Sequence, residues 1–391
     1  MIRFIIIEVI IDQFLNFMSQ NKNIINFQEL TVDIERIPGQ DLKDYLKDNV
    51  LGTPGGLRYK HTQAEEKLQN LGETYFLLLR KGKRMIGSVG LCYRQTFYSR
   101  ANYTSWYIRY FAIKSPMKLS KPNPDKLIGS SGKGFSHIRD AIMPILQKPC
   151  EHLKDIPAGT EKSLLYAYIE KENIQSARFG LQNDFETVRK MTTYVFSRFF
   201  PLKSKNVFEI AEDEKEFIRK RLREFYKSHS LFMEQNLFFK DNFLVFKKDG
   251  QIKAGMQANP DMWAIQEMPG IVGKLLVHVL PKLPVVNRIF NPRKLKFVAA
   301  DYIFWEPGFE NAISTLFETA CKLNNLKILM AWPDVNGPLI ETFDKHIQQG
   351  FVGKMNKRME VDVKIKFNGY GEKEKEVFYR NPAFISSFDL T

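Results

Sequence analysis

A short glycine- and serine-rich stretch is the part of this sequence best suited to bind a phosphate group. It reads Ser131, Gly132, Lys133, Gly134, Phe135 and Ser136. The apolar spacing from Phe135 to Gln147 predicts that a helix follows. Glycines let the backbone approach a ligand closely, and the free N–H groups and dipole of a helix's first turn attract anions. We predict a diphosphate-binding loop here, with a solvated linker as the alternative.

The spacing around this loop excludes two common nucleotide-binding motifs. The GxxxxGK[ST] spacing of a Walker A loop is absent. The strands predicted around the loop form hairpins rather than βαβ units, which argues against a dinucleotide-binding fingerprint. The loop therefore needs another explanation, which its neighbouring elements supply.

Composition narrows the class of protein. The chain has 391 residues, 44% of them apolar and 26% charged, which is typical of a globular protein of two or three domains. Three widely spaced cysteines and six scattered histidines form no disulfide framework and no metal-ligand motif, so we predict no metal and a cytoplasmic location. The formal charge of +14 favours an anionic partner.

In the first half, β-branched and aromatic runs predict a sheet. Thr74–Leu79 and Met85–Tyr93 flank a turn and predict a hairpin. Ser105–Ile113 and Leu164–Ile169 predict two further strands on either side of the glycine-rich loop. Tyr194–Phe200 is predicted to continue this sheet.

The second half repeats this order of elements. The predicted elements are a hairpin over Phe243–Lys247 and Gln251–Gln257, a strand over Lys296–Phe304, a helix over Glu310–Leu323, a strand over Lys327–Trp332 and a final hairpin over Lys354–Phe367. Because both halves follow the same order, we predict an internal duplication of a mixed α/β unit.

The residues after the loop strengthen the case for a specific fold. The strand ending at Ile169 leads to Asn173, and the following predicted helix ends near Phe185, twelve positions on. This arrangement resembles the GNAT superfamily of N-acetyltransferases, in which a glycine-containing loop cradles the coenzyme A diphosphate. The resemblance covers most of residues 74–200 and, more loosely, 240–367, where Gly350-Phe351 closes the corresponding helix.

The resemblance implies a fold, a reaction and a set of cofactor contacts. It implies an α+β protein of two GNAT-like domains in tandem, each with helices on both faces of a mostly antiparallel sheet. The implied reaction transfers an acyl group, acetyl first among the candidates, from an acyl-CoA to a small-molecule or peptidyl amine by direct attack. The implied cofactor-binding residues are Phe111, Ala112, Ile113, Ser131, Gly132, Lys133, Gly134, Phe135, Ser136 and Asn173.

Several positions depart from the family pattern. The loop lacks the basic or amide side chain that usually precedes its glycines, and Asp184 replaces the glycine before Phe185. Gly180 stands where many members carry a tyrosine that protonates the leaving thiolate. In the second half, Glu306–Glu310 (EPGFE) replaces the loop, and its acids would repel a diphosphate. We therefore expect the cofactor in the first half.

The general base is the least determined part of the predicted site. Glu172 lies at a strand end, where a solvated surface charge is the simpler interpretation. Asp301 lies within an otherwise apolar strand, and a buried carboxylate needs either a partner or a function. Both residues are candidates for the base that deprotonates the acceptor amine.

The predicted domain plan has four parts. Residues 1–20 form an apolar segment, either an amphipathic helix or a stretch upstream of a true start at Met18, which we favour. Residues 21–200 form the first domain, 201–235 a helical connection and 236–391 the second, degenerate domain.

Two other functions remain open. The fold could serve a non-catalytic protein that binds acyl-CoA or another ligand. Alternatively, the basic and aliphatic segment 269–297 could hold the protein on an anionic membrane, or pack on the second domain. The sequence has no signature of a nucleic-acid-binding fold, so nucleic acid is the partner we least expect.

Overall fold

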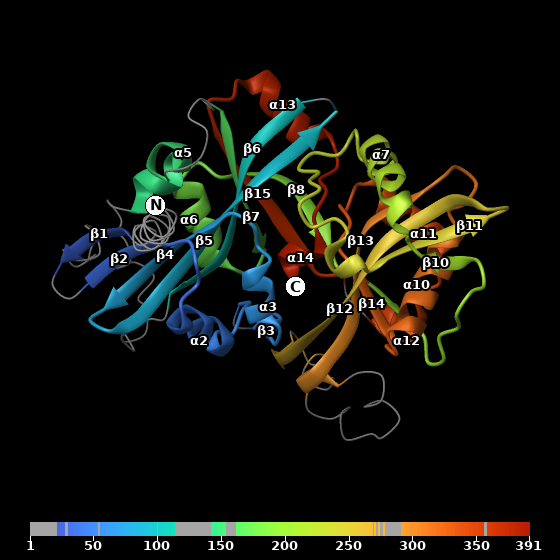
Figure 1. The fold of residues 1–391 in the computed structure, drawn as a ribbon. Helices are drawn as coiled ribbons and strands as arrows, with labels where there is room; N and C mark the ends of the chain where they lie inside the picture. Colours follow the sequence, from blue (N-terminus) through green and yellow to red (C-terminus); the bar gives the residue numbers. More distant parts are fainter. Residues whose placement is uncertain are drawn as a thin grey trace, which may run out of the picture. The chain divides into compact units, whose positions relative to one another are not determined.

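A computed structural model provides the three-dimensional structure (Figure 1). It describes residues 22–27, 30–53, 55–99, 101–113, 142–153, 162–268, 270, 273, 277, 291–355 and 358–391. Two compact units are present. The first comprises Met1–Asn49, Ala64–Tyr93 and Trp106–Leu165, and the second comprises Val50–Gln63, Arg94–Ser105 and Tyr166–Thr391. The N-terminal segment 1–20 lies outside the described residues, and the predicted domain limits stay a prediction.

The first unit is built on an antiparallel meander. Its strands are β1 (Lys22–Phe27), β2 (Leu30–Glu35), β4 (Thr74–Lys81) and the first part of β5 (Arg84–Tyr98), each paired antiparallel with the next. The β4–β5 pair is the predicted first hairpin, which is confirmed. Its helices are α2 (Gln40–Asp48), α3 (Ala64–Gln69) and α5 (Pro149–His152), and residues 142–147 are also helical. Val32, Leu79 and Ile86 pack together in its core.

Three strands have residues in both units. They are β5, β6 (Ala101–Ile113) and β7 (Ser163–Glu170). They belong to a sheet with the order β1-β2-β4-β5-β6-β7-β15-β8, whose last members are β15 (Glu360–Asn368) and β8 (Glu186–Thr192). Helices α6 (Ile174–Gln182) and α13 (Glu372–Arg380) also belong to the second unit.

A second sheet lies wholly within the second unit. Its order is β10-β11-β12-β13-β14-β9, and β3 also pairs with β12. The strands are β3 (Arg58–His61), β9 (Tyr194–Ser197), β10 (Val207–Glu209), β11 (Phe243–Lys248), β12 (Gln251–Glu267), β13 (Leu295–Trp305) and β14 (Ile328–Ala331). β13 and β14 run parallel, and the other pairs with a described register run antiparallel. The predicted hairpin β11–β12 is confirmed.

Helices cover both faces of this second sheet because β13 alternates apolar side chains. Val298, Ala300 and Ile303 share a core with helix α10 (Ala312–Leu323) and helix α11 (Pro338–His346). Tyr302 and Phe304 share another core with helix α7 (Lys215–Phe225). The remaining helices are α12 (Gly350–Met355), α14 (Ser387–Leu390) and the short 3-10 helices Glu212–Glu214, Phe239–Asp241 and Pro292–Lys294. The α+β prediction, with mostly antiparallel sheets, is confirmed.

Two strands lie elsewhere than the sequence predicted. Tyr194–Phe200 does not continue the first sheet, because β9 ends at Ser197 and pairs with β14 of the second sheet. Lys354–Phe367 is not a hairpin: helix α12 ends at Met355, and β15 is a single strand that pairs with β8. The two halves therefore exchange their terminal strands between the sheets. Such pairings join residues far apart in sequence, which local patterns do not encode.

No helix in the described part of the chain is long and apolar enough to cross a membrane.

Candidate functional site

The second sheet opens where β13 and β14 part. These parallel strands pair at Val298 with Leu329, Ala299 with Met330, and Ala300 with Ala331. β14 ends at Ala331, whereas β13 continues to Trp305. Beyond Ala300 and Ala331, sheet hydrogen bonds therefore no longer join these two segments, and the side chains that follow can line a pocket.

A β-bulge in β13 lies at this point. Gly255 pairs with Phe304 and Gln257 pairs with Asp301, so β13 has one residue more than β12 between these pairs. Tyr302 in the bulge has a φ of +49°, the left-handed conformation that bulges accommodate. The carbonyl of Ile303 accepts a hydrogen bond of 2.7 Å from the hydroxyl of Tyr226. Bulges re-aim side chains, and both Asp301 and Tyr302 line the pocket described next.

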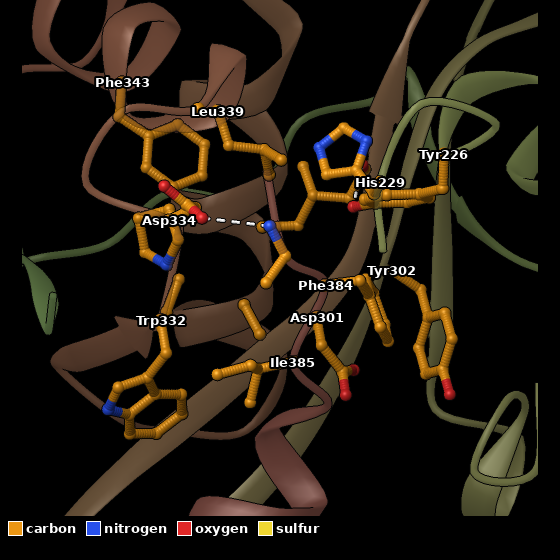
Figure 2. A pocket seen from close by; sticks show the side chains of 16 residues that line it. Tyr226, His229, Asp301, Tyr302, Trp332, Asp334, Leu339, Phe343, Phe384 and Ile385 are labelled. Carbon is orange, nitrogen blue, oxygen red and sulfur yellow. Dashed lines mark hydrogen bonds between the residues drawn. The ribbon is translucent and has the colours of Figure 1, made fainter. Parts of the chain in front are cut away.

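A small pocket lies at this opening (Figure 2). Aromatic and aliphatic side chains make most of its wall. Its polar lining comes from Asp301 and Tyr302 on β13, Asp334 after β14, and Tyr226 and His229 after α7. Apolar walls with a few polar groups are typical of sites for small molecules or single side chains.

Asp301 is a buried carboxylate in this pocket. The residue is 5% exposed. Its Oδ2 accepts hydrogen bonds of 2.9 Å from the hydroxyl of Ser386 and from the backbone N–H of Ser387. Its Oδ1 is buried and has no hydrogen-bond partner among the described residues. Burial raises the pKa of Asp301 to about 7, since the serine hydrogen bonds offset only part of the desolvation.

Asp334 is, by contrast, fully committed to neighbouring groups. Arg189 binds it in a bidentate manner, with nitrogen–oxygen distances of 2.8 and 2.7 Å. Its Oδ2 also accepts a hydrogen bond of 2.9 Å from the backbone N–H of Ala383, drawn as the dashed line in Figure 2. Bidentate pairs of arginine and carboxylate are strong and geometrically specific. Asp334 therefore positions the chain around the pocket.

His229 is a buried imidazole. It is 2% exposed, and neither ring nitrogen has a hydrogen-bond partner in the part of the chain that is described. Burial is the main cause that lowers the pKa of His229, to about 4. The negative charge of Asp334 raises this pKa, and the positive charge of Arg189 lowers it. The ring is therefore neutral at pH 7, with one nitrogen that can donate and one that can accept.

Burial of His229 as a neutral ring predicts acid-sensitive stability. Because its pKa is lower in the folded than in the unfolded protein, its contribution is fully present above about pH 6.5 and is lost as the pH falls towards 4. The free energy of unfolding of the wild type should fall through this window by roughly 3 kcal/mol more than that of His229→Phe. Urea unfolding at a series of pH values measures both. If the free energies of unfolding of the two proteins differ by the same amount at every pH, His229 is not a buried neutral ring with a lowered pKa.

The predicted cofactor residues are described only in part. Ser131, Gly132, Lys133, Gly134, Phe135 and Ser136 lie outside the described residues. Phe111 is 43% exposed near the end of β6, and the Ala112 carbonyl accepts a 3.2 Å hydrogen bond from the hydroxyl of Tyr45. Ile113 ends the strand. The first-half site therefore stays a prediction.

Strand β6 shares one feature with β13. Tyr110 has a φ of +53° and lies three residues before the end of β6, and Tyr302 has the same relation to the end of β13. The Tyr110 carbonyl accepts a 3.1 Å hydrogen bond from the hydroxyl of Ser88. The matching left-handed tyrosines support the predicted duplication. No sequence signal pointed to them, because tyrosine is not a residue that favours positive φ.

The residues after β7 form a helix cap rather than an obvious cofactor contact. The side chain of Asn173 accepts a 3.0 Å hydrogen bond from the backbone N–H of Ser176 and so caps α6. Asp184 has a φ of +61°, which explains why a glycine is usual at this position in the family pattern. Phe185 is buried beside Gly180.

The two glutamates at the end of β7 differ. Glu172 is exposed. Glu170 is partly buried and accepts a 3.1 Å hydrogen bond from the backbone N–H of Thr53, and burial raises its pKa. Of the two predicted candidates for the base, Asp301 lies in a pocket and Glu172 faces solvent.

In the second half, carboxylates replace the phosphate-binding loop. Glu306 pairs with Lys253 at 2.9 Å and also with Arg221. The backbone N–H of Gly308 donates a 3.1 Å hydrogen bond to the side chain of Glu310. An N–H group that could face a phosphate is therefore occupied by an acid of the chain itself, consistent with the expected repulsion.

Comparison with known proteins identifies the fold. No protein-family model matches the chain, and no curated protein matches it in sequence. Among solved structures, Saccharomyces cerevisiae N-myristoyltransferase with bound myristoyl-CoA and inhibitors is similar at a TM-score of 0.55 and 9% identity, over 93% of this chain and 87% of that one. The same enzyme with myristoyl-CoA gives 0.54 and 9%, over 92% and 90%.

The chain has a GNAT-superfamily fold. A GCN5-related N-acetyltransferase from Sphaerobacter thermophilus is also similar, at a TM-score of 0.43 and 11% identity over 79% of this chain and 86% of that one. The predicted resemblance is confirmed for the fold, and the two sheets correspond to the two-domain form seen in N-myristoyltransferase. At 9% identity the likeness concerns architecture alone, so the chemistry must be argued from this chain's own residues.

Proposed function

We propose that this protein is an N-acyltransferase that moves an acyl group from a coenzyme A thioester to an amine. The observation that carries the proposal is the carboxylate of Asp301, buried in a pocket where two parallel strands part and poised to ionise near pH 7. N-myristoyltransferase, whose fold this chain shares, has been solved with bound myristoyl-CoA. The acyl donor is an acyl-CoA, acetyl-CoA first among the candidates, and the protein acts in the cytoplasm.

Asp301 acts as the general base for the acceptor. An amine at neutral pH carries a proton that must leave before its nitrogen can attack. The free Oδ1 of Asp301 accepts this proton, and the nitrogen then forms a bond to the thioester carbon. The carbon–sulfur bond breaks, and the thiolate takes up the second proton that the nitrogen loses as the amide forms, so coenzyme A leaves as the free thiol. No covalent enzyme intermediate is needed, so the chain requires no cysteine or serine nucleophile.

The acceptor binds in the pocket around Asp301. A small-molecule amine or the amino group of a peptide fits the polar lining, because Asp301 can accept from the amine and neutral His229 can donate to or accept from a second polar group.

The acyl-CoA contacts are those predicted from the sequence. Backbone N–H groups near Gly132 and Gly134 bind the diphosphate, and residues Phe111–Ile113 contact the cofactor. Asn173 uses its Oδ1 to cap α6, so its contact with the cofactor is made through Nδ2.

The Gly134→Asp variant is expected to lose acyl-CoA binding, since a carboxylate at the loop would repel the diphosphate. Acetyl-CoA and longer acyl-CoAs should raise the melting temperature of the wild type but not that of the variant, as measured by thermal shift. Gly371→Asp is a matched control, because Gly371 precedes α13 with a φ of −78°, and a Cβ there would meet only the Glu374 carboxylate, at 3.7 Å. Equal stabilisation of wild type and Gly134→Asp would refute the loop assignment.

A non-catalytic binding protein is the second candidate. Gly180 provides no hydroxyl where the family pattern places a tyrosine acid. A side chain at this position would meet Lys364 and Phe185, each 3.5 Å from where its Cβ would lie. Release of free thiol from acyl-CoA with a panel of amines distinguishes the two functions. Binding without amine-dependent release would favour this second function.

A further inference from the structure

The loop between β9 and β10 exposes large apolar side chains. Phe200 is 85% exposed, Leu202 70% and Phe199 43%. Phe351, the second residue of α12, is 51% exposed and lies 6.2 Å from Phe199 between ring centroids. We call these four residues the Phe200 face. Isolated exposed apolar side chains are common in proteins, but four of them on one loop and on a helix whose Phe351 contacts that loop indicate an interaction surface.

The backbone that carries this face is held firmly. The backbone N–H of Leu202 donates a 3.1 Å hydrogen bond to the carboxylate of Glu318 on α10, and that of Ser204 donates a 3.1 Å hydrogen bond to the hydroxyl of Thr319. The guanidinium of Arg198 donates a 2.9 Å hydrogen bond to the Gln348 carbonyl. In Figure 1 the green segment leading to β10 runs beside α10 and α12. The exposure is therefore built into the fold rather than caused by a loose chain.

Three exposed lysines lie close to the Phe200 face along the chain. Lys203 and Lys205 are exposed and lie one and three positions after Leu202, and the exposed Lys354 lies one helical turn from Phe351 on α12. The carboxylate of Glu318, which contacts the loop, accepts a hydrogen bond from the backbone N–H of Leu202 and lies 3.9 Å from the guanidinium of Arg198.

We propose that the Phe200 face docks on an anionic membrane surface. The phenylalanine and leucine side chains enter the boundary between headgroups and acyl chains, and the lysines contact the lipid phosphates. A second copy of the chain fits less well. In a two-fold symmetric dimer the same patch meets itself, which would place the lysines of both copies within one interface. The proposal concerns a surface separate from the pocket and does not depend on the proposed reaction.

Co-sedimentation of the full chain with vesicles tests the proposal. We expect binding to vesicles of phosphatidylcholine mixed with phosphatidylserine, and much weaker binding to phosphatidylcholine alone. The double variant Phe200→Ser/Leu202→Ser should bind the mixed vesicles at least about tenfold more weakly. Lys203→Gln and Lys205→Gln should each weaken binding about fivefold and reduce the preference for phosphatidylserine.

Control variants separate this face from a general effect. Leu181→Ser removes a side chain that is 79% exposed on α6, and Lys373→Gln removes an exposed charge on α13. Both should bind as the wild type does. Absence of vesicle binding by the wild type would overturn the proposal, as would unchanged binding of the Phe200→Ser/Leu202→Ser variant. A wild-type dimer in solution that this variant dissociates would assign the face to self-association instead.

Discussion

Asp301→Asn is expected to slow acyl transfer about 10²- to 10⁴-fold, the usual contribution of a positioned general base. Asparagine keeps the shape of the side chain and can still accept from Ser386 and Ser387, so the pocket should stay intact. The rate is measured as amine-dependent release of thiol at saturating acyl-CoA. Asp249→Asn, in the exposed β11–β12 turn, should leave it unchanged. An undiminished rate for Asp301→Asn would remove Asp301 from the mechanism.

The pH dependence provides an independent test of the same residue. The wild-type rate should rise with pH through about 7, where Asp301 ionises, and the Asn variant should lack this step. Stability should change in the opposite direction. Because burial raises the pKa of Asp301, its contribution to stability is fully present below about pH 4 and is lost as the pH rises through 7. As the pH rises through this window, the free energy of unfolding of Asp301→Asn should increase by roughly 4 kcal/mol relative to that of the wild type.

Asp389→Asn is expected to destabilise the protein by about 3–5 kcal/mol. The guanidinium of Arg94 on β5 lies 3.2 Å from the carboxylate of Asp389 on α14, and both side chains are 0% exposed. Removing the negative charge takes away the carboxylate that faces this buried guanidinium at 3.2 Å, which is costly in a medium of low polarity. Urea unfolding monitored by tryptophan fluorescence measures the loss.

Two companion variants test the physical reason for this loss. Arg94→Met/Asp389→Leu replaces both charges with apolar groups and should recover most of the stability, because burying an ion pair carries its own desolvation penalty. Glu151→Ala breaks an exposed pair with Lys148 and should cost less than about 1 kcal/mol. A loss at Asp389 no larger than that at Glu151 would show that the buried pair contributes little.

The local elements of this fold could be predicted from the sequence. Both hairpins, the strand carrying Asp301 and the helix after it follow from hydrophobic periodicity and turn residues, which depend only on neighbouring positions. The twelve-residue spacing from Asn173 to Phe185 indicated the GNAT fold. Asp301 itself was a candidate because a single acid in an apolar strand needs a partner or a role.

Only the tertiary structure decided which strands meet and what lies between them. The exchange of β9 and β15 between sheets joins residues far apart in the chain. The bulge at Tyr302 depends on register with β12, and the pocket on where β13 and β14 stop pairing. The sequence suggested no role for His229, because its burial comes from elements folding around it. The preference of a segment for helix, strand or turn depends on neighbouring residues, whereas register, burial and the resulting pKa values arise from contacts between distant segments.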